Sequence, residues 1–174
     1  AGRVIRLTNE NGAHTTFAYD PMDRLIEQIN FDGRTQRYAY DIAGRLTQTN
    51  DAGQPSRLHY DKGDRLVLRE VGEATNPYQE HFEYTRDGSM KKAWHRTELW
   101  GNTISVEFER DALGHITRET QLVIDAQGTE AWKHSVHRQF NPIGVETQTT
   151  YSGLPPIEWQ TYGPGHLHGV VLDG

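Results

Sequence analysis

The chain has 174 residues, of which 34% are hydrophobic, with no cysteine and a formal net charge of −6. This length is typical of one domain, the acidic balance argues against nucleic acid as the main partner, and the absence of cysteine excludes disulfides and thiolate metal sites. No apolar run approaches the roughly 18 residues of a membrane-spanning helix, and no signal peptide opens the segment. This low apolar content predicts a single sheet that is exposed to solvent on both faces over much of its area.

A seven-residue motif recurs along the first 70 residues. It reads YDPMDRL at residues 19–25, YDIAGRL at 40–46 and YDKGDRL at 60–66. The copies start 21 and 20 residues apart, and a fixed period in this range indicates a repeat architecture.

Each copy of the motif has the chemistry of a hairpin turn. An aromatic residue ends a strand, Asp folds its carboxylate back onto the turn, and Arg-Leu begins the return strand. Gly44 is expected at positive φ, and Asp replaces it at positions 23 and 64 because Asp also visits the left-handed region. The motif therefore predicts a turn, with no catalytic role for its Asp residues.

A second turn lies about half a period away, at residues 9–12, 30–33 and 50–53. The segments between the two kinds of turn have six or seven residues, which is the usual length of a strand. One repeat is therefore predicted to be one hairpin and the link to the next.

From residue 71 the copies diverge and the spacing loosens. Later turns of the first kind are predicted at 84–90, 110–116, 140–146 and 162–167, and intermediate turns at 100–102, 125–128 and 151–153, after a longer loop at 71–77. Ile104, Val106 and Phe108 alternate with polar residues, as in a half-buried strand. The residues expected to carry the structural motif are Tyr19, Asp20, Arg24, Tyr40, Asp41, Gly44, Arg45, Tyr60, Asp61, Arg65, Tyr84, Gly88, Asp111, Gly114, Phe140 and Gly144.

The predicted fold class is all-β: consecutive antiparallel hairpins over residues 1–174, regular in 1–70 and divergent in 71–174. Seven units of two strands give about 14 strands, and open sheets rarely exceed about ten without curling. The ribbon is therefore expected to curl and to carry Tyr, Arg and Thr ladders. Residues 1–7 read as half of a motif, so the chain is expected to be a piece of a longer array. Open edges near 4–7 and 170–172 would then favour association with neighbouring strands.

The repeated Tyr-Asp-x-x-Gly-Arg-Leu, with its second Asp/Asn-x-x-Gly turn, resembles the YD repeat of the Rhs (rearrangement hotspot) family. Residues 162–169 are similar to a segment of the enterobacterial-type Rhs core. The resemblance implies a spiral β-ribbon that forms a shell around a C-terminal toxin domain, used in bacterial competition. Related shells occur in insecticidal toxin complexes and in the teneurin adhesion proteins.

The resemblance also implies partners and a route. The implied partners are the remaining repeats of the shell, the enclosed toxin domain and a spike protein of the secretion apparatus. The protein would be secreted from the bacterial cytoplasm, by type VI secretion or a related route, without a signal peptide in this segment. The family's self-cleaving protease core carries paired Asp-Pro-x-Gly motifs. Residues 20–23 and 141–144 depart from that pattern, so the protease is not carried over.

The residues raise two other possible functions, a metal site and a sugar-binding surface. His166 with His168, and His134 with His137, lie close in sequence, but no third ligand completes a metal set, so no metal, cofactor or catalytic residue is expected. The alternative to a shell is a carbohydrate- or cell-surface-binding module, because four Trp and eight Tyr could stack on sugars. Aromatic residues at regular strand positions more often pack across strands.

Overall fold

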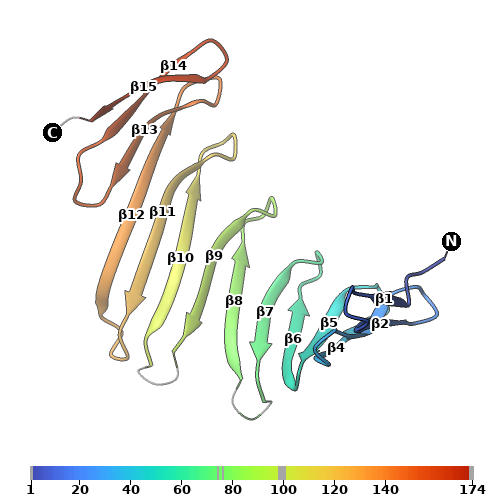
Figure 1. The fold of residues 1–174 in the computed structure, drawn as a ribbon. Helices are drawn as coiled ribbons and strands as arrows, with labels where there is room; N and C mark the ends of the chain where they lie inside the picture. The colour runs from blue at the N-terminus through green and yellow to red at the C-terminus, as the bar shows by residue number, and fades with distance from the viewer. Residues whose placement is uncertain (1, 74, 76, 98–100, 173–174) are drawn as a thin grey trace. The chain divides into compact units, whose positions relative to one another are not determined.

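The computed structural model describes residues 2–73, 75, 77–97 and 101–172, and every regular element in these residues is a β-strand (Figure 1). Fifteen strands occupy the sheet in the order in which they occur in the sequence. The chain divides into two compact units, residues 1–79 and 80–174. The prediction of an all-β array of antiparallel hairpins is confirmed, with one strand more than the seven predicted hairpins supply, because β1 (Arg6–Thr8) precedes them.

The first unit contains short strands joined by tight turns, and its neighbouring strands pair in antiparallel fashion. After β1 its strands are β2 (His14–Tyr19), β3 (Leu25–Ile29), β4 (Thr35–Tyr40), β5 (Leu46–Asp51), β6 (Gln54–Tyr60) and β7 (Leu66–Val71).

The second unit has longer strands in the same arrangement. They are β8 (Tyr78–Tyr84), β9 (Met90–Arg96), β10 (Thr103–Arg110), β11 (Ile116–Ile124), β12 (Glu130–Phe140), β13 (Glu146–Tyr151), β14 (Ile157–Tyr162) and β15 (His166–Leu172). Residues 74, 76 and 98–100 lie outside the described residues, so the predicted loop at 71–77 and the predicted turn at 100–102 are described only in part. Gly101 has a φ of 67° and its N–H donates to the carbonyl of Thr97.

No hydrophobic core forms within the described residues. Val136 is the one buried hydrophobic side chain among them, at 7% exposure, and the other buried residues are Thr15, Ser56, Ser105, Ser135 and Thr149. Small hydroxyl residues become buried in a single-layer sheet when larger neighbours on the adjacent strands cover them. This pattern agrees with the expectation that both faces of the sheet are exposed to solvent.

One detail of the predicted burial was wrong. The alternation in β10 is present, but Ser105 is 6% exposed whereas Ile104 is 39% exposed. Ser105 lies between its cross-strand partners Trp94 and Leu122, whose larger side chains cover it. Apolar residues are buried at alternate positions only when a second layer covers that face.

Candidate functional site: the Tyr-Asp turns

In each regular copy, the Asp side chain holds the turn together. In the second copy, Asp41 Oδ1 accepts the N–H groups of Ala43 and Arg45, both at 2.9 Å. Asp41 Oδ2 accepts the Arg45 Nε–H at 2.7 Å. Asp20 and Asp61 make the same three contacts in their own turns. The carboxylate therefore satisfies two loop amides and one guanidinium, which leaves it committed to the turn.

The residue before the Arg adopts positive φ in every copy. Gly44 has a φ of 86°, and Asp23 and Asp64 have φ of 67° and 62°, as predicted. A Cβ built on Gly44 would meet no atom within 4 Å. The preference for Gly at this position therefore comes from the backbone angle and not from lack of space. The corresponding turns of the later copies, which begin with Thr85, Asp111 and Asn141, likewise place Gly88, Gly114 and Gly144 at φ of 92°, 90° and 81°.

The Tyr of each regular copy joins that copy to the one before it. The Tyr40 hydroxyl donates to the carbonyl of Leu25 at 2.9 Å, and the Tyr60 hydroxyl donates to the carbonyl of Leu46 at 2.8 Å. Tyr19 donates to the carbonyl of Val4 at 3.0 Å. The bonds from Tyr40 and Tyr60 join neighbouring strands of successive hairpins, β4 to β3 and β6 to β5, in addition to the backbone ladder.

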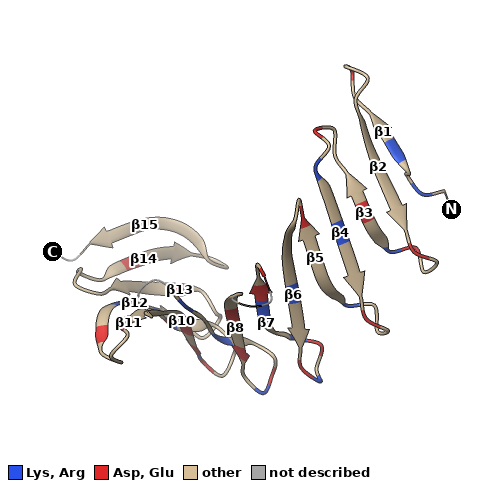
Figure 2. Ribbon diagram, turned by 90° about the horizontal axis from the view of Figure 1, so that it is seen from below, with Lys and Arg blue, Asp and Glu red and all other residues tan. Residues whose placement is uncertain are grey.

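The Arg of the first and second copies lies between its own Asp and the next copy. The Arg24 guanidinium lies 4.8 Å from the Tyr40 ring centroid and its Nη1 donates to the carbonyl of Asp41 at 3.1 Å. Arg45 lies 5.0 Å from the Tyr60 centroid and pairs with Asp64 at 2.6 Å. Figure 2 shows these charged residues gathered at the ends of the hairpins β2–β3, β4–β5 and β6–β7.

The Arg before the first copy makes the same link. Arg3 lies 5.5 Å from the Tyr19 ring centroid and pairs with Asp23 at 2.7 Å. Thus Asp23 and Asp64, where Asp stands in place of Gly, both receive the guanidinium of the preceding copy. We call this arrangement the Arg-Tyr link: the Arg of one copy on the aromatic ring and the turn of the next.

The later copies keep the turn and change its chemistry. His115 takes the place of Arg: its Nδ1 lies 2.8 Å from Asp111 Oδ2, and its ring stacks on Phe140 with centroids 4.7 Å apart. The turn at 84–88 uses Thr85 instead, and its hydroxyl donates to the carbonyl of Ser89 at 3.0 Å, with Tyr84 ending the strand before it.

The turn at residues 141–144 has the uncharged Asn141 in the place of Asp. The Asn141 Oδ1 accepts the amide N–H groups of Ile143 and Val145 at 3.1 and 3.0 Å. The turn role of this position thus survives the exchange of Asp for Asn. A carboxylate is not required for it.

The turn carboxylates have lowered pKa values. The backbone N–H of Arg24 is the largest cause for the lowered pKa of Asp20, and the side chain of Arg65 is the largest for Asp61. Partial burial alone would raise the pKa of Asp41, but hydrogen bonds from the side chain and backbone of Arg45 outweigh it. The His115 side chain lowers the pKa of Asp111 in the same way. Carboxylates held ionised by hydrogen bonds are poor general acids at neutral pH.

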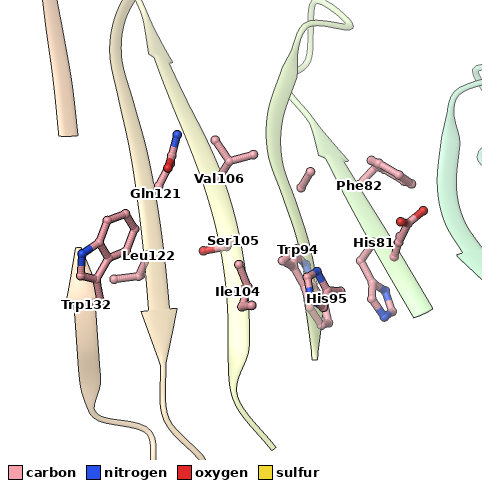
Figure 3. Close-up of a pocket in the computed structure, with 12 residues that line it drawn as sticks. His81, Phe82, Trp94, His95, Ile104, Ser105, Val106, Gln121, Leu122 and Trp132 are labelled. Atoms are coloured by element: carbon pink, nitrogen blue, oxygen red, sulfur yellow. The ribbon is translucent and has the colours of Figure 1, made fainter. Parts of the chain in front are cut away.

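The second unit carries a cavity of about 530 Å³ across β8 to β12 (Figure 3). Its lining includes His81 and Trp94, whose rings stack with centroids 3.8 Å apart and an interplanar angle of 6°. It also includes Phe82, Ile104 and Trp132, and the Trp132 side chain is half exposed. The volume is in the range of small-molecule sites, and the lining mixes aromatic rings with a few polar groups.

Metal and membrane signatures are missing from the part of the chain that the structure describes. There, no three His, Asp or Glu side chains come together as metal ligands would. The rings of His166 and His168 both contact Tyr162 instead. In the same residues, no helix is long and apolar enough to cross a membrane.

Sequence reasoning missed the Arg-Tyr link. It expected ladders of Tyr, Arg and Thr at matching positions of successive repeats, whereas the structure pairs the Arg of one copy with the Tyr of the next. The signal was present in the period: Arg24 precedes Tyr40 by 16 residues and Arg45 precedes Tyr60 by 15. These separations place the two side chains on neighbouring hairpins.

Comparison with known proteins yields a family match and curated relatives. The RHS Repeat family model matches residues 1–35. Over 93 residues, 53% of this chain, it is 37% identical to "Toxin protein Tse5" of Pseudomonas aeruginosa. It is 27% identical over 140 residues to "Double-stranded DNA deaminase toxin A" of Burkholderia cenocepacia. The chain spans 6% and 10% of these two relatives.

Solved structures with a similar fold include the TcdB2-TccC3 proteins. The crystal structure of TcdB2-TccC3-Cdc42 matches 92% of this chain at a TM-score of 0.55 and 14% identity. That of TcdB2-TccC3-TEV matches 95% at a TM-score of 0.53 and 12% identity. The chain covers 10% of each, and at such low identity the likeness concerns the fold alone. The family match and the relatives confirm the resemblance of the repeated motif to the Rhs family.

Proposed function

We propose that this chain is a structural stretch of an Rhs-type repeat shell that encloses a toxin domain of a longer polypeptide. Its role is to build the wall and to carry no chemistry of its own. The observation that supports this most directly is the Arg-Tyr link, since Tyr40 and Arg24 join successive hairpins into one continuous sheet. Contacts that join each repeat to the next stabilise an extended wall of repeats.

The chemistry of the turn residues supports the structural role. Asp20, Asp41 and Asp61 each use both carboxylate oxygens within their own turn. We therefore assign the motif residues, which run from Tyr19 to Gly144, to folding and to contacts between repeats. We propose that the whole of residues 1–174 belongs to the repeat region.

The proposed partners are the other repeats of the shell and the enclosed toxin domain. This proposal rests on the names of the two curated relatives, which are toxins, and on the fold shared with the TcdB2-TccC3 structures. The proposal includes delivery out of a bacterium, by type VI secretion with a spike protein or by a related route, and this part rests on the resemblance of the motif to the Rhs family.

Electron cryomicroscopy of the longer polypeptide that contains this chain tests the shell. We expect a hollow β-walled particle with density for a second domain inside it, and resistance of that domain to added protease. A repeat segment that extends freely, with an accessible C-terminal domain digested as fast as the domain alone, would refute enclosure.

A carbohydrate-binding module is the second candidate, and the cavity with the His81–Trp94 stack supports it. Aromatic rings flanked by polar groups are suited to the apolar faces and hydroxyls of sugars. A glycan array probed with the chain, with its Trp94→Ala and Trp132→Ala variants, and with Tyr162→Ala as a control outside the cavity, tests it. Binding lost only in the first two variants would favour this function. Signals no higher for the chain than for the two cavity variants would exclude it.

A further inference from the structure

Hairpins β10–β11 and β12–β13 are neighbours in the sheet (Figure 1), and a titratable side chain joins them. His115 occupies the place of Arg in one copy, and Phe140 occupies the place of Tyr in the next. Their rings stack with centroids 4.7 Å apart and an interplanar angle of 20°. We call this contact the His-Phe link. Phe140 has no hydroxyl and cannot repeat the bond that Tyr40 makes to the preceding copy, which leaves more of the connection to the stacked rings.

The imidazole of His115 lies between its own turn and the turn of the next copy. Its Nδ1 is 2.8 Å from Asp111 Oδ2. An ionised carboxylate only accepts hydrogen bonds, so Nδ1 carries the hydrogen of the neutral imidazole. The other nitrogen, Nε2, lies against the next turn, because a Cβ built on Gly144 would be 2.9 Å from it. The side chain is 28% exposed, so a proton taken up at Nε2 places a positive charge within the link.

Both neighbours of the imidazole favour that charge. The His115 side chain is the largest cause of the lowered pKa of Asp111, and the Leu113 amide also donates to this carboxylate at 2.9 Å. A carboxylate forms a stronger hydrogen bond with a charged donor than with a neutral one. The face of an aromatic ring such as that of Phe140 attracts a cation. The neutral imidazole keeps the hydrogen bond and the stacking but lacks the ionic part of both contacts.

Other charged side chains lie in or directly beside the turns of β8–β9, β10–β11 and β12–β13. Apart from Asp111 and His115, they are Arg86, Asp87, Arg110 and Glu146. Asp87 accepts the Ser89 amide at 3.2 Å, and Glu146 accepts the hydroxyl of Thr149. Arg110 donates to the carbonyl of Gly114 at 3.5 Å, so it is the positive charge on the same hairpin that opposes protonation. Asp111 is the carboxylate in direct contact with the imidazole, and its attraction acts at the shorter distance.

We propose that the His-Phe link is a pH-dependent joint between repeats, which is stabilised when His115 takes up a proton and weakened when His115 is neutral. Arg24 and Arg45 stay charged over the whole pH range in which proteins are folded, so the Arg-Tyr links do not respond. Histidine ordinarily titrates at about pH 6.5. The added stabilisation is therefore present in mild acid and is lost as the pH rises through neutrality. This inference concerns two hairpins of the chain and does not depend on what the chain encloses.

Native-state hydrogen exchange of the full 174-residue chain at about pH 5.5 and about pH 8 tests the joint. The probe is the Val145 amide, which donates to Asn141 Oδ1 at 3.0 Å in the turn beside the imidazole. The matched control is the Arg45 amide, which donates to Asp41 Oδ1 at 2.9 Å in the turn that Arg24 contacts. After correction for intrinsic exchange, protection of Val145 should be about two- to fivefold higher at the lower pH, as expected for a partly exposed cation–π contact. Protection of Arg45 should be equal at both.

A double-mutant cycle separates the charge from the packing. The coupling between His115→Gln and Phe140→Leu in urea unfolding, written as a factor in the equilibrium constant, should be about two- to fivefold larger at the lower pH. His115→Arg should keep the link and remove the pH dependence of Val145 protection. His137→Gln is the control for another histidine of the same unit, next to Arg118, and should leave that dependence unchanged.

Two kinds of result would overturn the inference. Equal changes in the protection of Val145 and Arg45 would assign the pH response to the whole sheet and exclude a local joint. Coupling that is the same at both pH values, or a pH dependence that persists in His115→Arg, would exclude the imidazole as its source. Neither kind bears on the enclosure of a toxin domain, which electron cryomicroscopy tests separately.

Discussion

The guanidinium of Arg24 lies 4.8 Å from the centroid of the Tyr40 ring, while the Tyr40 hydroxyl donates to the carbonyl of Leu25, the residue that follows Arg24. One repeat thus contacts both the ring and the hydroxyl of the Tyr in the next repeat. The same geometry recurs between Arg45 and Tyr60 at 5.0 Å. In a sheet with almost no buried apolar side chain, such links between hairpins take the place that a core has in other domains.

A double-mutant cycle tests the Arg-Tyr link. We expect Arg24→Gln and Tyr40→Leu to be coupled by about 0.5–1 kcal/mol in urea unfolding, because a guanidinium over an aromatic face is stabilising even when partly exposed. Arg24→Gln with Tyr38→Leu is the control, since Tyr38 bonds to Gln36 instead. Additive effects in the Arg24 and Tyr40 pair would remove the energetic role of the link.

Tyr40→Phe and Tyr60→Phe isolate the hydroxyl bonds between copies. Each should lower the free energy of unfolding by about 0.5–1.5 kcal/mol, the usual net value of one intramolecular hydrogen bond. Tyr162→Phe is the control, because that side chain is 61% exposed and has no hydrogen bond to another described residue. If all three variants unfold at the same urea concentration as the parent chain, the hydroxyl bonds contribute nothing.

Gly44→Val should destabilise the chain by about 1–3 kcal/mol, because a β-branched residue is strained at positive φ. Gly44→Asp should cost much less. Asp23 and Asp64 already occupy this backbone region, and each receives the Arg of the preceding copy, as Arg24 could do for an Asp at 44. Thermal melts of both variants measure the difference. Equal melting temperatures would contradict the argument from backbone angle.

Stability should fall in acid because the turn carboxylates have lowered pKa values. Above the unfolded-state Asp pKa of about 3.9, Asp20, Asp41, Asp61 and Asp111 contribute fully, and their contribution is lost as pH falls through the lower folded-state pKa values. The urea midpoint should therefore hold from neutral pH to near pH 4 and then decline. Asp41→Asn should be less stable than the parent at pH 7, and the gap should close below pH 4. A gap independent of pH would exclude a role for that ionisation.

No tightly bound metal and no catalytic activity are expected from this chain. The Asp side chains that might be taken for ligands are engaged by loop amides and by Arg24, Arg45 or Arg65. Elemental analysis of the purified protein should show substoichiometric zinc and calcium. One metal ion per chain, lost in an Asp111→Asn variant, would contradict this expectation.

The period and the turn chemistry were readable from the sequence because both are local. Tyr40 to Leu46 encode a strand end, a capped turn and a strand start within seven residues, and the positive φ of Gly44, Asp23 and Asp64 follows from which residue types tolerate it. Antiparallel order follows in turn, since tight turns join only antiparallel neighbours.

Contacts between repeats needed the tertiary structure. Which side chain reaches the next hairpin depends on register and twist, and a residue count alone does not say that Arg24 contacts Tyr40 while it stays paired with Asp20. The burial of individual side chains also needed the tertiary structure, because Ser105 is buried and Ile104 is exposed, contrary to their hydropathy. In a sheet of one layer, the neighbours on adjacent strands decide what is buried, and those neighbours are known only once the strands are paired.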